Sequence, residues 1–174
     1  SELFDDVIRR SIMKRLKKIY PYHTEVVGSD ILFQQDGGVM IFSRWPIALV
    51  PDELAEKTFG EDCRGSDCWS DKGVIYARVD KQGHPYHIFG THTQAGREDG
   101  EDIPARRKQF QVIKKFIDKH KIPKSEPIIL GGDLNVDLIT QKHEYGLMLD
   151  NLRMLHPPLR GRLFSFDPVS NPLG

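Results

Sequence analysis

The stretch Pro127-Ile128-Ile129-Leu130-Gly131-Gly132-Asp133-Leu134-Asn135 passes from an apolar run directly into a polar segment. A short apolar run that ends in glycine predicts a buried β-strand over 127–130. If the extended geometry continues, Asp133 and Asn135 point to the same side, because side chains two residues apart share a face of a strand. An Asp there can orient or deprotonate water, and an Asn can hold a phosphate oxygen without adding repulsive charge. The alternative is a plain turn, since Gly, Asp and Asn are common turn residues.

Helix-like and strand-like segments alternate on either side of this stretch, which is typical of a layered α/β protein. Apolar periodicity predicts helices over 5–20, 104–120 and 141–155. Strands are expected over 31–34, 38–43, 47–50, 73–79 and 86–90, with a hairpin turn at 80–83. The apolar stripe of the first helix consists of Ile8, Ile12, Leu16 and Ile19, and its basic opposite face is interpreted as solvated. The second helix is expected to turn inward Phe110, Ile113, Phe116 and Ile117.

The bulk composition is that of a globular protein without electrostatic bias. The chain has 174 residues, of which 39% are apolar and 29% are charged, and its 25 Lys and Arg balance its 25 Asp and Glu. A protein that binds nucleic-acid phosphates usually carries a basic excess, so this balance counts against DNA or RNA as a partner. No apolar run approaches the roughly 20 residues of a membrane span, and no signal peptide is visible. The first residue is Ser1, which is compatible with an export signal having been removed or left out.

Two further residues are candidates for chemistry. His92 lies just after an expected strand, in Phe89-Gly90-Thr91-His92-Thr93-Gln94. There it could protonate an alkoxide or bind a phosphate oxygen. The alternative is a strand-end histidine that is merely hydrogen-bonded. Glu2 lies just before the first helix and offers a hard oxygen ligand that suits Mg²⁺. The alternative for Glu2 is an acid that complements the helix dipole.

The chain has two cysteines, Cys63 and Cys68, in a polar loop that contains glycine. Two cysteines alone do not make a structural zinc site, and no His pair lies at zinc-finger spacing. A local disulfide and two free thiols both stay open. A disulfide would fit an oxidising, extracytoplasmic setting.

Together these segments resemble the bacterial neutral sphingomyelinases, members of the endonuclease/exonuclease/phosphatase superfamily that also holds deoxyribonucleases, abasic-site endonucleases and inositol-polyphosphate 5-phosphatases. The resemblance extends from Glu2 to Asn171. The segments that carry it are Glu2-Leu3-Phe4-Asp5, 37–47, Lys72-Gly73-Val74-Ile75-Tyr76, Gly90-Thr91-His92-Thr93-Gln94-Ala95, 131–136, and Phe166-Asp167-Pro168 through Asn171. The Gly-Asp-x-Asn segment and the strand-end His are shared across the superfamily, and the combination with the other strands narrows the resemblance to sphingomyelinases.

This resemblance implies a four-layered α/β sandwich in which two mostly antiparallel sheets are flanked by helices. It also implies a secreted enzyme that hydrolyses sphingomyelin at a membrane surface to ceramide and phosphocholine. Glu2 would hold Mg²⁺, Asp133 and Asn135 would orient water and phosphate, and His92 would stabilise or protonate the departing ceramide oxygen. Arg106 aligns with a recurrent family arginine and is interpreted as a helix-surface or structural residue.

The chain departs from the family pattern at both ends. The family supplies another metal-site Asn before the Glu and a general base from a C-terminal Ser-Asp-His, and no Asp-His pair occurs in this sequence. We therefore expect residues 1–174 to be a single catalytic domain that is incomplete at both ends, lacks terminal strands and is inactive by itself. Two alternatives stay open: another phosphodiesterase or phosphatase of the superfamily (a nuclease or an inositol phosphatase), or a non-catalytic homologue that binds membranes.

Overall fold

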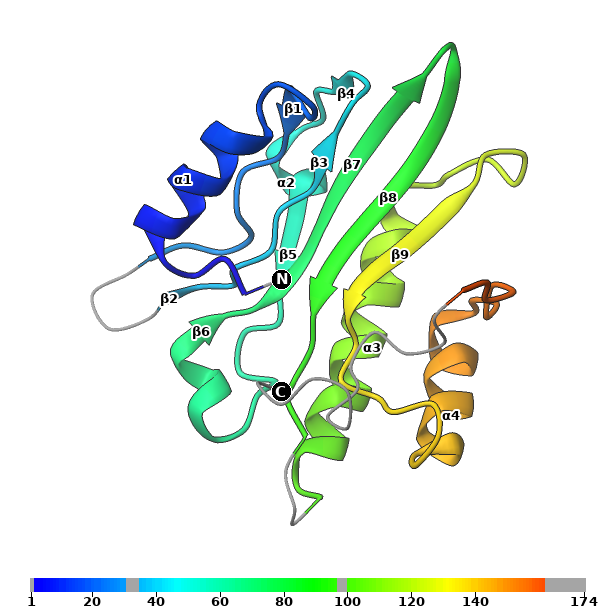
Figure 1. Cartoon of the computed structure of the whole chain (residues 1–174). Coiled ribbons are helices and arrows are strands. Elements are labelled where there is room, and N and C mark those ends of the chain that lie inside the picture. Colours follow the sequence, from blue (N-terminus) through cyan, green and yellow to red (C-terminus); the bar gives the residue numbers. More distant parts are fainter. Residues whose placement is uncertain (1, 31–34, 97–99, 162–174) are drawn as a thin grey trace.

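The structure is a computed structural model that describes residues 2–30, 35–96 and 100–161 (Figure 1). Its helices are α1 (Asp6–Leu16), α2 (Asp52–Ala55), α3 (Asp102–Lys119) and α4 (Lys142–Leu152), with a 3₁₀ turn η1 (Gly65–Trp69). The short strands are β1 (Tyr22–His23), β2 (Gln35–Asp36), β3 (Phe42–Ser43), β4 (Ile47–Ala48), β5 (Glu56–Thr58) and β6 (Ser70–Asp71). The long strands are β7 (Gly73–Lys81), β8 (His84–His92) and β9 (Ile128–Asp133).

A five-stranded sheet organises the molecule. Its order is β4-β7-β8-β9, with β5 also paired to β7. Every pairing in this sheet is antiparallel except that of β8 with β9, which is parallel. Two smaller pairs, β1 with β3 and β2 with β6, lie on the α1 side, while α3 and α4 lie on the other side (Figure 1). The expected fold class, α/β with several sheets flanked by helices, is confirmed.

The β7–β8 hairpin follows from local turn chemistry. Gln82 and Gly83 have φ angles of 57° and 83°, the left-handed backbone that a two-residue hairpin turn requires. The backbone N–H of Gly83 also donates a 2.7 Å hydrogen bond to the Asp80 carboxylate. The hairpin predicted at 80–83 is confirmed. Beside the turn both strands are two residues longer than expected, and β8 is also two residues longer at its C-terminal end.

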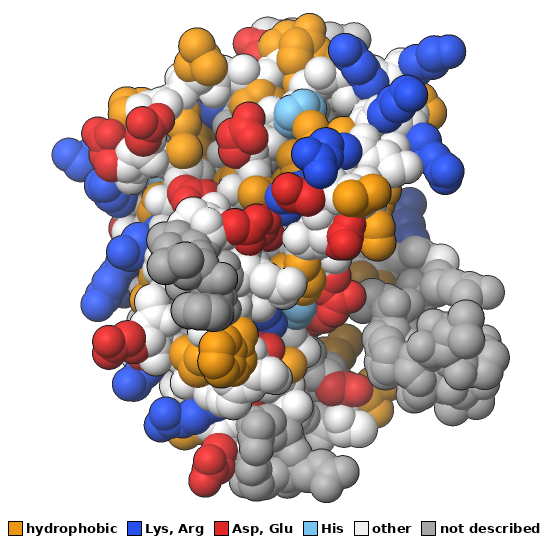
Figure 2. All heavy atoms as spheres, turned by 90° about the vertical axis from the view of Figure 1, so that its left-hand side faces the viewer, with side chains coloured by type: hydrophobic (Ala, Val, Ile, Leu, Met, Phe, Trp, Pro, Cys, Tyr) orange, Lys and Arg blue, Asp and Glu red, His pale blue; other side chains and the backbone are white. Residues whose placement is uncertain are grey.

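The first helix differs from its prediction. It ends at Leu16 rather than near residue 20, and none of its residues is buried. Ile8 is 56% exposed and Ile19 is 52% exposed, so the apolar stripe is only partly covered by the described residues. Periodicity shows that apolar side chains share a face, but it does not show that another element packs on that face. Figure 2 shows the side of the molecule that carries α1, where acidic and basic side chains are interspersed.

Three predicted strands are shorter than expected or lie outside the described residues. The strand expected over 31–34 lies outside the described residues. Only 42–43 and 47–48 form regular ladders in the strands expected over 38–43 and 47–50. The segment around Gly38 instead makes isolated backbone hydrogen bonds, with Leu3 donating to Gly38 O and Val27 donating to Val39 O. These contacts attach the start of the chain to the small-strand layer.

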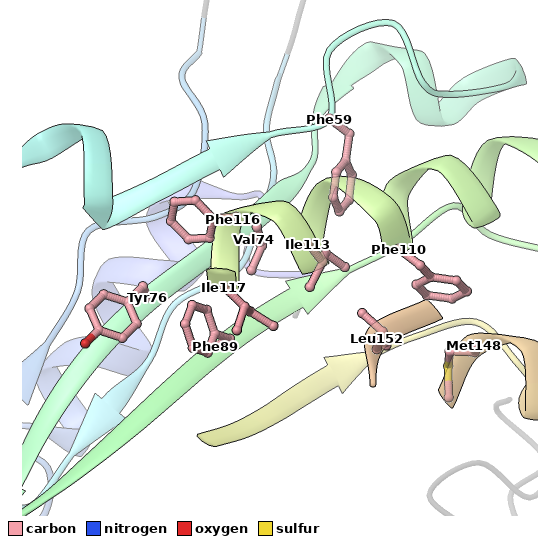
Figure 3. Close-up of a cluster of buried hydrophobic side chains, with 10 residues drawn as sticks. All are labelled: Phe59, Val74, Tyr76, Phe89, Phe110, Ile113, Phe116, Ile117, Met148 and Leu152. Carbon is pink, nitrogen blue, oxygen red and sulfur yellow. The ribbon is translucent and has the colours of Figure 1, made fainter. Parts of the chain in front are cut away.

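The main core lies between the sheet and the helices α3 and α4 (Figure 3). The sheet side contributes Phe59, Val74, Tyr76 and Phe89, and the helices contribute Phe110, Ile113, Phe116, Ile117, Met148 and Leu152. All four side chains predicted to face inward from the second helix are in this cluster. A smaller cluster of Val27, Val39 and Ile75 covers the opposite face of the sheet. Both faces of β7 are therefore packed.

No helix in the described ranges combines the length and the apolar character needed to cross a membrane.

Removing core volume tests this packing. Ile113 is fully buried, so Ile113→Ala should lower the free energy of unfolding by about 2–5 kcal/mol, through lost burial and the cavity left behind. Ile8→Ala, on the 56% exposed position of α1, should change it by no more than about 0.5 kcal/mol. Urea unfolding followed by circular dichroism measures both values. Equal losses for the two variants would contradict the placement of the core.

Candidate functional site

The parallel pairing of β8 with β9 brings two predicted residues together. In its register His92 lies opposite Asp133, at the C-terminal ends of both strands. The pairing continues one step further, because the backbone N–H of Thr93 donates a 2.9 Å hydrogen bond to the carbonyl of Asp133. Side chains from segments some forty residues apart thus meet at one edge of the sheet.

Asn135 joins this group through a turn. Of the extended and turn geometries left open for this segment, the structure has the turn, because β9 ends at Asp133 and Asn135 has a left-handed φ of 49°. The Asp133 carboxylate accepts a 2.9 Å hydrogen bond from the backbone N–H of Asn135, which closes the turn. The Asn135 amide then donates a 3.0 Å hydrogen bond to the carbonyl of Thr93. The segment is a turn, and that turn holds Asn135 against the end of β8.

Gly132 makes this close approach of the strands possible. Its φ of 128° is disfavoured for residues with a side chain, and an added Cβ would lie 1.9 Å from the carbonyl oxygen of Thr91. Gly131 beside it has open space where a Cβ would be. Of the two glycines that precede Asp133, the second is the one that the geometry requires.

His92 is buried, with 5% of its surface exposed. Its Nε2 lies 3.4 Å from the ammonium of Lys72, which also donates to Asp67 at 2.9 Å and to the carbonyl of Thr93 at 3.3 Å. Burial, and next the positive charge of Lys72, lower the pKa of His92, while Asp133, Glu2 and Asp67 oppose this shift. The net shift favours the neutral form of the His92 ring.

Glu2 reaches the same edge of the sheet from the start of the chain. Its carboxylate is close enough to act electrostatically on His92, and the ring of Phe4 lies 6.3 Å from the His92 ring. Glu2 has a left-handed φ of 66°. The cap of α1 is Asp5, whose carboxylate accepts hydrogen bonds from the backbone N–H groups of Val7 and Ile8, so the helix does not need Glu2.

A separate acidic group involves α1 and β2. The carboxylates of Asp6, Asp30 and Asp36 offer oxygens within 4.8 Å of one another, close enough to hold one cation. The Arg9 guanidinium already forms ion pairs with Asp36, at 2.5 Å, and with Asp6. Its charge offsets the repulsion in this group, and we assign no metal there.

The two cysteines form a disulfide, which resolves the alternative left open by their spacing. It closes the loop that carries η1. This loop contacts the segment after β8. Asp67 accepts a 2.7 Å hydrogen bond from the backbone N–H of Ala95, and the backbone N–H of Arg64 donates one of the same length to the Gln94 side chain.

Sequence reasoning did not single out Asp67 or Lys72 as site residues. The only local signal was a charged residue directly before an apolar strand.

Arg106 is buried rather than on the surface of its helix, with 1% of its area exposed. Its Nη1 donates to Asp102 at 2.5 Å and to the carbonyl of Gln94 at 3.1 Å. Of the two interpretations, helix-surface or structural, the structural one is correct.

The buried side-chain atoms without a hydrogen-bond partner in the described parts of the chain are His92 Nδ1, Thr93 Oγ1 and Arg106 Nη2. All three lie on or against the segment 92–94, which is the pattern expected where a ligand or water completes the bonding.

An apolar groove of about 480 Å³ lies at the other end of the sheet. Its lining residues include Tyr20, Trp45 and Tyr86, and none of His92, Asp133, Asn135 and Glu2 lines it. The candidate site is therefore the edge formed by His92, Asp133, Asn135 and Glu2, and not this groove.

Residues 5–172 match the Endonuclease/Exonuclease/phosphatase family. The chain belongs to this family. Over 184 residues it is 37% identical to a sphingomyelinase C from Leptospira interrogans, covering 98% of this chain and 32% of that protein. Over 188 residues it is 35% identical to a phospholipase C from Staphylococcus aureus, covering 98% of this chain and 54% of that protein.

Solved structures of family members agree with these relatives. A variant of beta toxin from Staphylococcus aureus, with bound magnesium ions, superposes with a TM-score of 0.85 at 34% identity. The match covers 98% of this chain and 62% of that one. The resemblance inferred from the sequence is confirmed. The chain spans about a third to about a half of the length of the two curated relatives above.

The two neighbouring glycines give a matched test of the site geometry. Gly132→Ala should lower the free energy of unfolding by more than about 1 kcal/mol, because the new Cβ collides with the Thr91 carbonyl and the left-handed φ is strained. Gly131→Ala should stay within about 0.5 kcal/mol of the original, since nothing lies within 4 Å of its Cβ position. Thermal and urea unfolding of both variants decide the point, and equal stability of the two would argue against the close approach of β8 and β9.

Proposed function

We propose that residues 1–174 belong to the catalytic domain of a Mg²⁺-dependent phosphodiesterase that hydrolyses sphingomyelin to ceramide and phosphocholine. The observation that carries this proposal is the convergence of His92, Asp133, Asn135 and Glu2 at one edge of the sheet. The substrate class comes from the likeness to proteins named sphingomyelinase C. Family membership alone does not select a substrate, so the relatives and the site have to be taken together.

The donor set suits a magnesium ion. Glu2 and Asp133 are both exposed carboxylates near His92, and Mg²⁺ prefers such oxygen ligands while retaining several waters. Glu2 would hold the ion. When bound, the ion would offset negative charge on the phosphate.

The other residues act on water and phosphate. The exposed Asp133 carboxylate accepts a hydrogen bond from Asn135 N at one oxygen, and it can orient or deprotonate the attacking water. The Asn135 amide has two N–H donors, of which one binds the Thr93 carbonyl and the other can bind a phosphate oxygen. His92 stabilises or protonates the ceramide oxygen as its bond to phosphorus breaks. Each group would act mainly where charge develops in the reaction.

The proposed setting is extracellular, at the surface of a membrane that contains sphingomyelin. The Cys63–Cys68 disulfide supports an oxidising compartment. The net charge of zero, and the mixture of acidic and basic side chains on the face in Figure 2, argue against nucleic acid as the substrate. The main competing function is hydrolysis of another phosphate ester by the same site.

A substrate panel separates these functions. The full-length protein should hydrolyse sphingomyelin in vesicles with added Mg²⁺, and it should leave a DNA duplex and an inositol polyphosphate essentially intact. Phosphocholine, nucleotide and inorganic phosphate release are measured in parallel. Preferred turnover of DNA or of the inositol phosphate would move the assignment to that substrate, and inactivity on all three would favour a non-catalytic homologue.

The metal role of Glu2 can be tested with a charge-neutral variant. Glu2→Gln should lower activity and raise the Mg²⁺ concentration needed for half-maximal rate, because a neutral amide is a weaker ligand for a hard cation. Glu53→Gln, on the exposed start of α2, is the control and should leave the Mg²⁺ titration unchanged. Full activity of the original protein in excess chelator would remove the metal from the proposal.

The proposed roles of Asp133 and Asn135 can be tested against Asp137, a turn residue in the same loop. Asp133→Ala and Asn135→Ala should each lower kcat by at least about 10²-fold while the fold stays intact, as expected for groups that act on the reacting phosphate. Asp137 is the control because its carboxylate accepts hydrogen bonds from the backbone N–H groups of Ile139 and Thr140 in the same loop. Asp137→Ala removes a turn contact only and should retain most of the activity. Unchanged turnover in either of the first two variants would mean that the segment is only a turn.

A further inference from the structure

The ammonium of Lys72 faces one ring nitrogen of His92 and restricts what that nitrogen can do. Its Nζ has three neighbours within hydrogen-bond distance: Asp67 Oδ2 at 2.9 Å, Thr93 O at 3.3 Å and His92 Nε2 at 3.4 Å. A lysine ammonium has three N–H donors and no acceptor. A proton on His92 Nε2 would therefore point at another donor, so this nitrogen has to present its lone pair to Lys72.

The opposite nitrogen then carries the proton. A neutral imidazole has a single N–H, and an imidazolium would place a second N–H against the Lys72 ammonium. With Nε2 as the acceptor, the proton is on Nδ1. That atom is buried and has no hydrogen-bond partner in the part of the chain that the structure describes. A buried N–H without an acceptor is costly, and an oxygen of a bound ligand would satisfy it.

The position of Lys72 is itself well determined. Its side chain is only 6% exposed, and its backbone carbonyl accepts a 2.8 Å hydrogen bond from the N–H of Phe59. Its partner Asp67 is 15% exposed and also accepts a hydrogen bond from Ala95 N at 2.7 Å. An ion pair that is largely removed from water strongly penalises the loss of either partner, so the ammonium has little freedom to turn away from His92.

We propose that Lys72 is a positioning residue that fixes the Nδ1–H tautomer of His92, and that this Nδ1–H is the group that donates to a phosphodiester oxygen. The catalytic part of this inference rests on the proposed function, whereas the tautomer does not. His92 then acts as a neutral hydrogen-bond donor to the oxygen on which charge develops, and no proton has to leave the ring. A neutral imidazole can fulfil such a role when its surroundings keep it uncharged.

The tautomer can be read directly by NMR of the full-length protein, without substrate. In a long-range ¹H–¹⁵N spectrum the protonated and unprotonated ring nitrogens of a neutral histidine have well-separated shifts. The His92 signals are assigned by their loss in His92→Asn. We expect Nδ1 to be protonated and Nε2 to be unprotonated. A ring protonated at Nε2, alone or together with Nδ1, overturns the inference.

Variants of Lys72 test what fixes the tautomer. Lys72→Met should shift His92 toward the Nε2–H form, whereas Lys72→Arg should keep the Nδ1–H form because a guanidinium also only donates. Lys108→Met is the control, since Lys108 is an exposed lysine paired with Asp62, and its spectrum should match that of the original protein. Should Lys72→Met fail to fold, Asp67→Asn weakens the same ammonium contact while Lys72 stays. An unchanged tautomer in a folded Lys72→Met protein would show that Lys72 does not set it.

Kinetics then connect the tautomer to the reaction. Lys72→Met should lower kcat on sphingomyelin by about 10²-fold with little change in KM, as for the loss of one donor that acts in the transition state, and Lys72→Arg should recover part of it. A raised KM with unchanged kcat, or no recovery of kcat in Lys72→Arg, would argue against the positioning role. If sphingomyelin is not hydrolysed at all while the Nδ1–H tautomer is observed, the proposed function fails and the positioning of His92 stands.

Discussion

The arrangement of the site depends on one parallel strand pairing, that of β8 with β9. Parallel strands bring their C-terminal ends to the same edge of a sheet, and they need a long connection between them. Here α3 supplies that connection. His92 and Asp133 each end a strand, so the register that pairs them also sets the spacing of these two residues. In an antiparallel pairing of the same two strands, these ends would lie at opposite edges.

Helix α3 couples the stability of the core to the geometry of the site. Its apolar face supplies Phe110, Ile113, Phe116 and Ile117 to the main cluster (Figure 3). Its buried polar residues bind the segment that follows β8, because Gln109 accepts a 2.7 Å hydrogen bond from the backbone N–H of Gln94 and Arg106 donates to the carbonyl of Gln94. A displacement of this helix would therefore move the segment next to His92 as well as open the core.

Two buried ion pairs hold the segment that follows β8. Asp67 with Lys72 and Asp102 with Arg106 are ion pairs with little exposed surface, and both bind the segment 93–95 through its backbone. Taking such charges out of water costs several kcal/mol per ion, and packing with apolar residues would often serve stability as well. Their presence is better explained by the polar segment that they hold in place than by stability alone.

The sequence by itself determined the types of the main elements, the β7–β8 turn, the inward face of α3 and the family, because periodicity, turn chemistry and short motifs are local properties. It also identified His92, Asp133, Asn135 and Glu2 as candidate site residues. Only the tertiary structure decided that Asn135 lies in a turn, that Arg106 is buried, that Cys63 and Cys68 are bonded, and that Lys72 faces His92. At 133–135 and at the two cysteines, the local pattern allowed two alternatives and did not choose between them. The burial of Arg106 and the contact of Lys72 with His92 depend instead on contacts between segments far apart in the chain. No local pattern encodes such contacts, and they are set by how the strands pair and the helices pack.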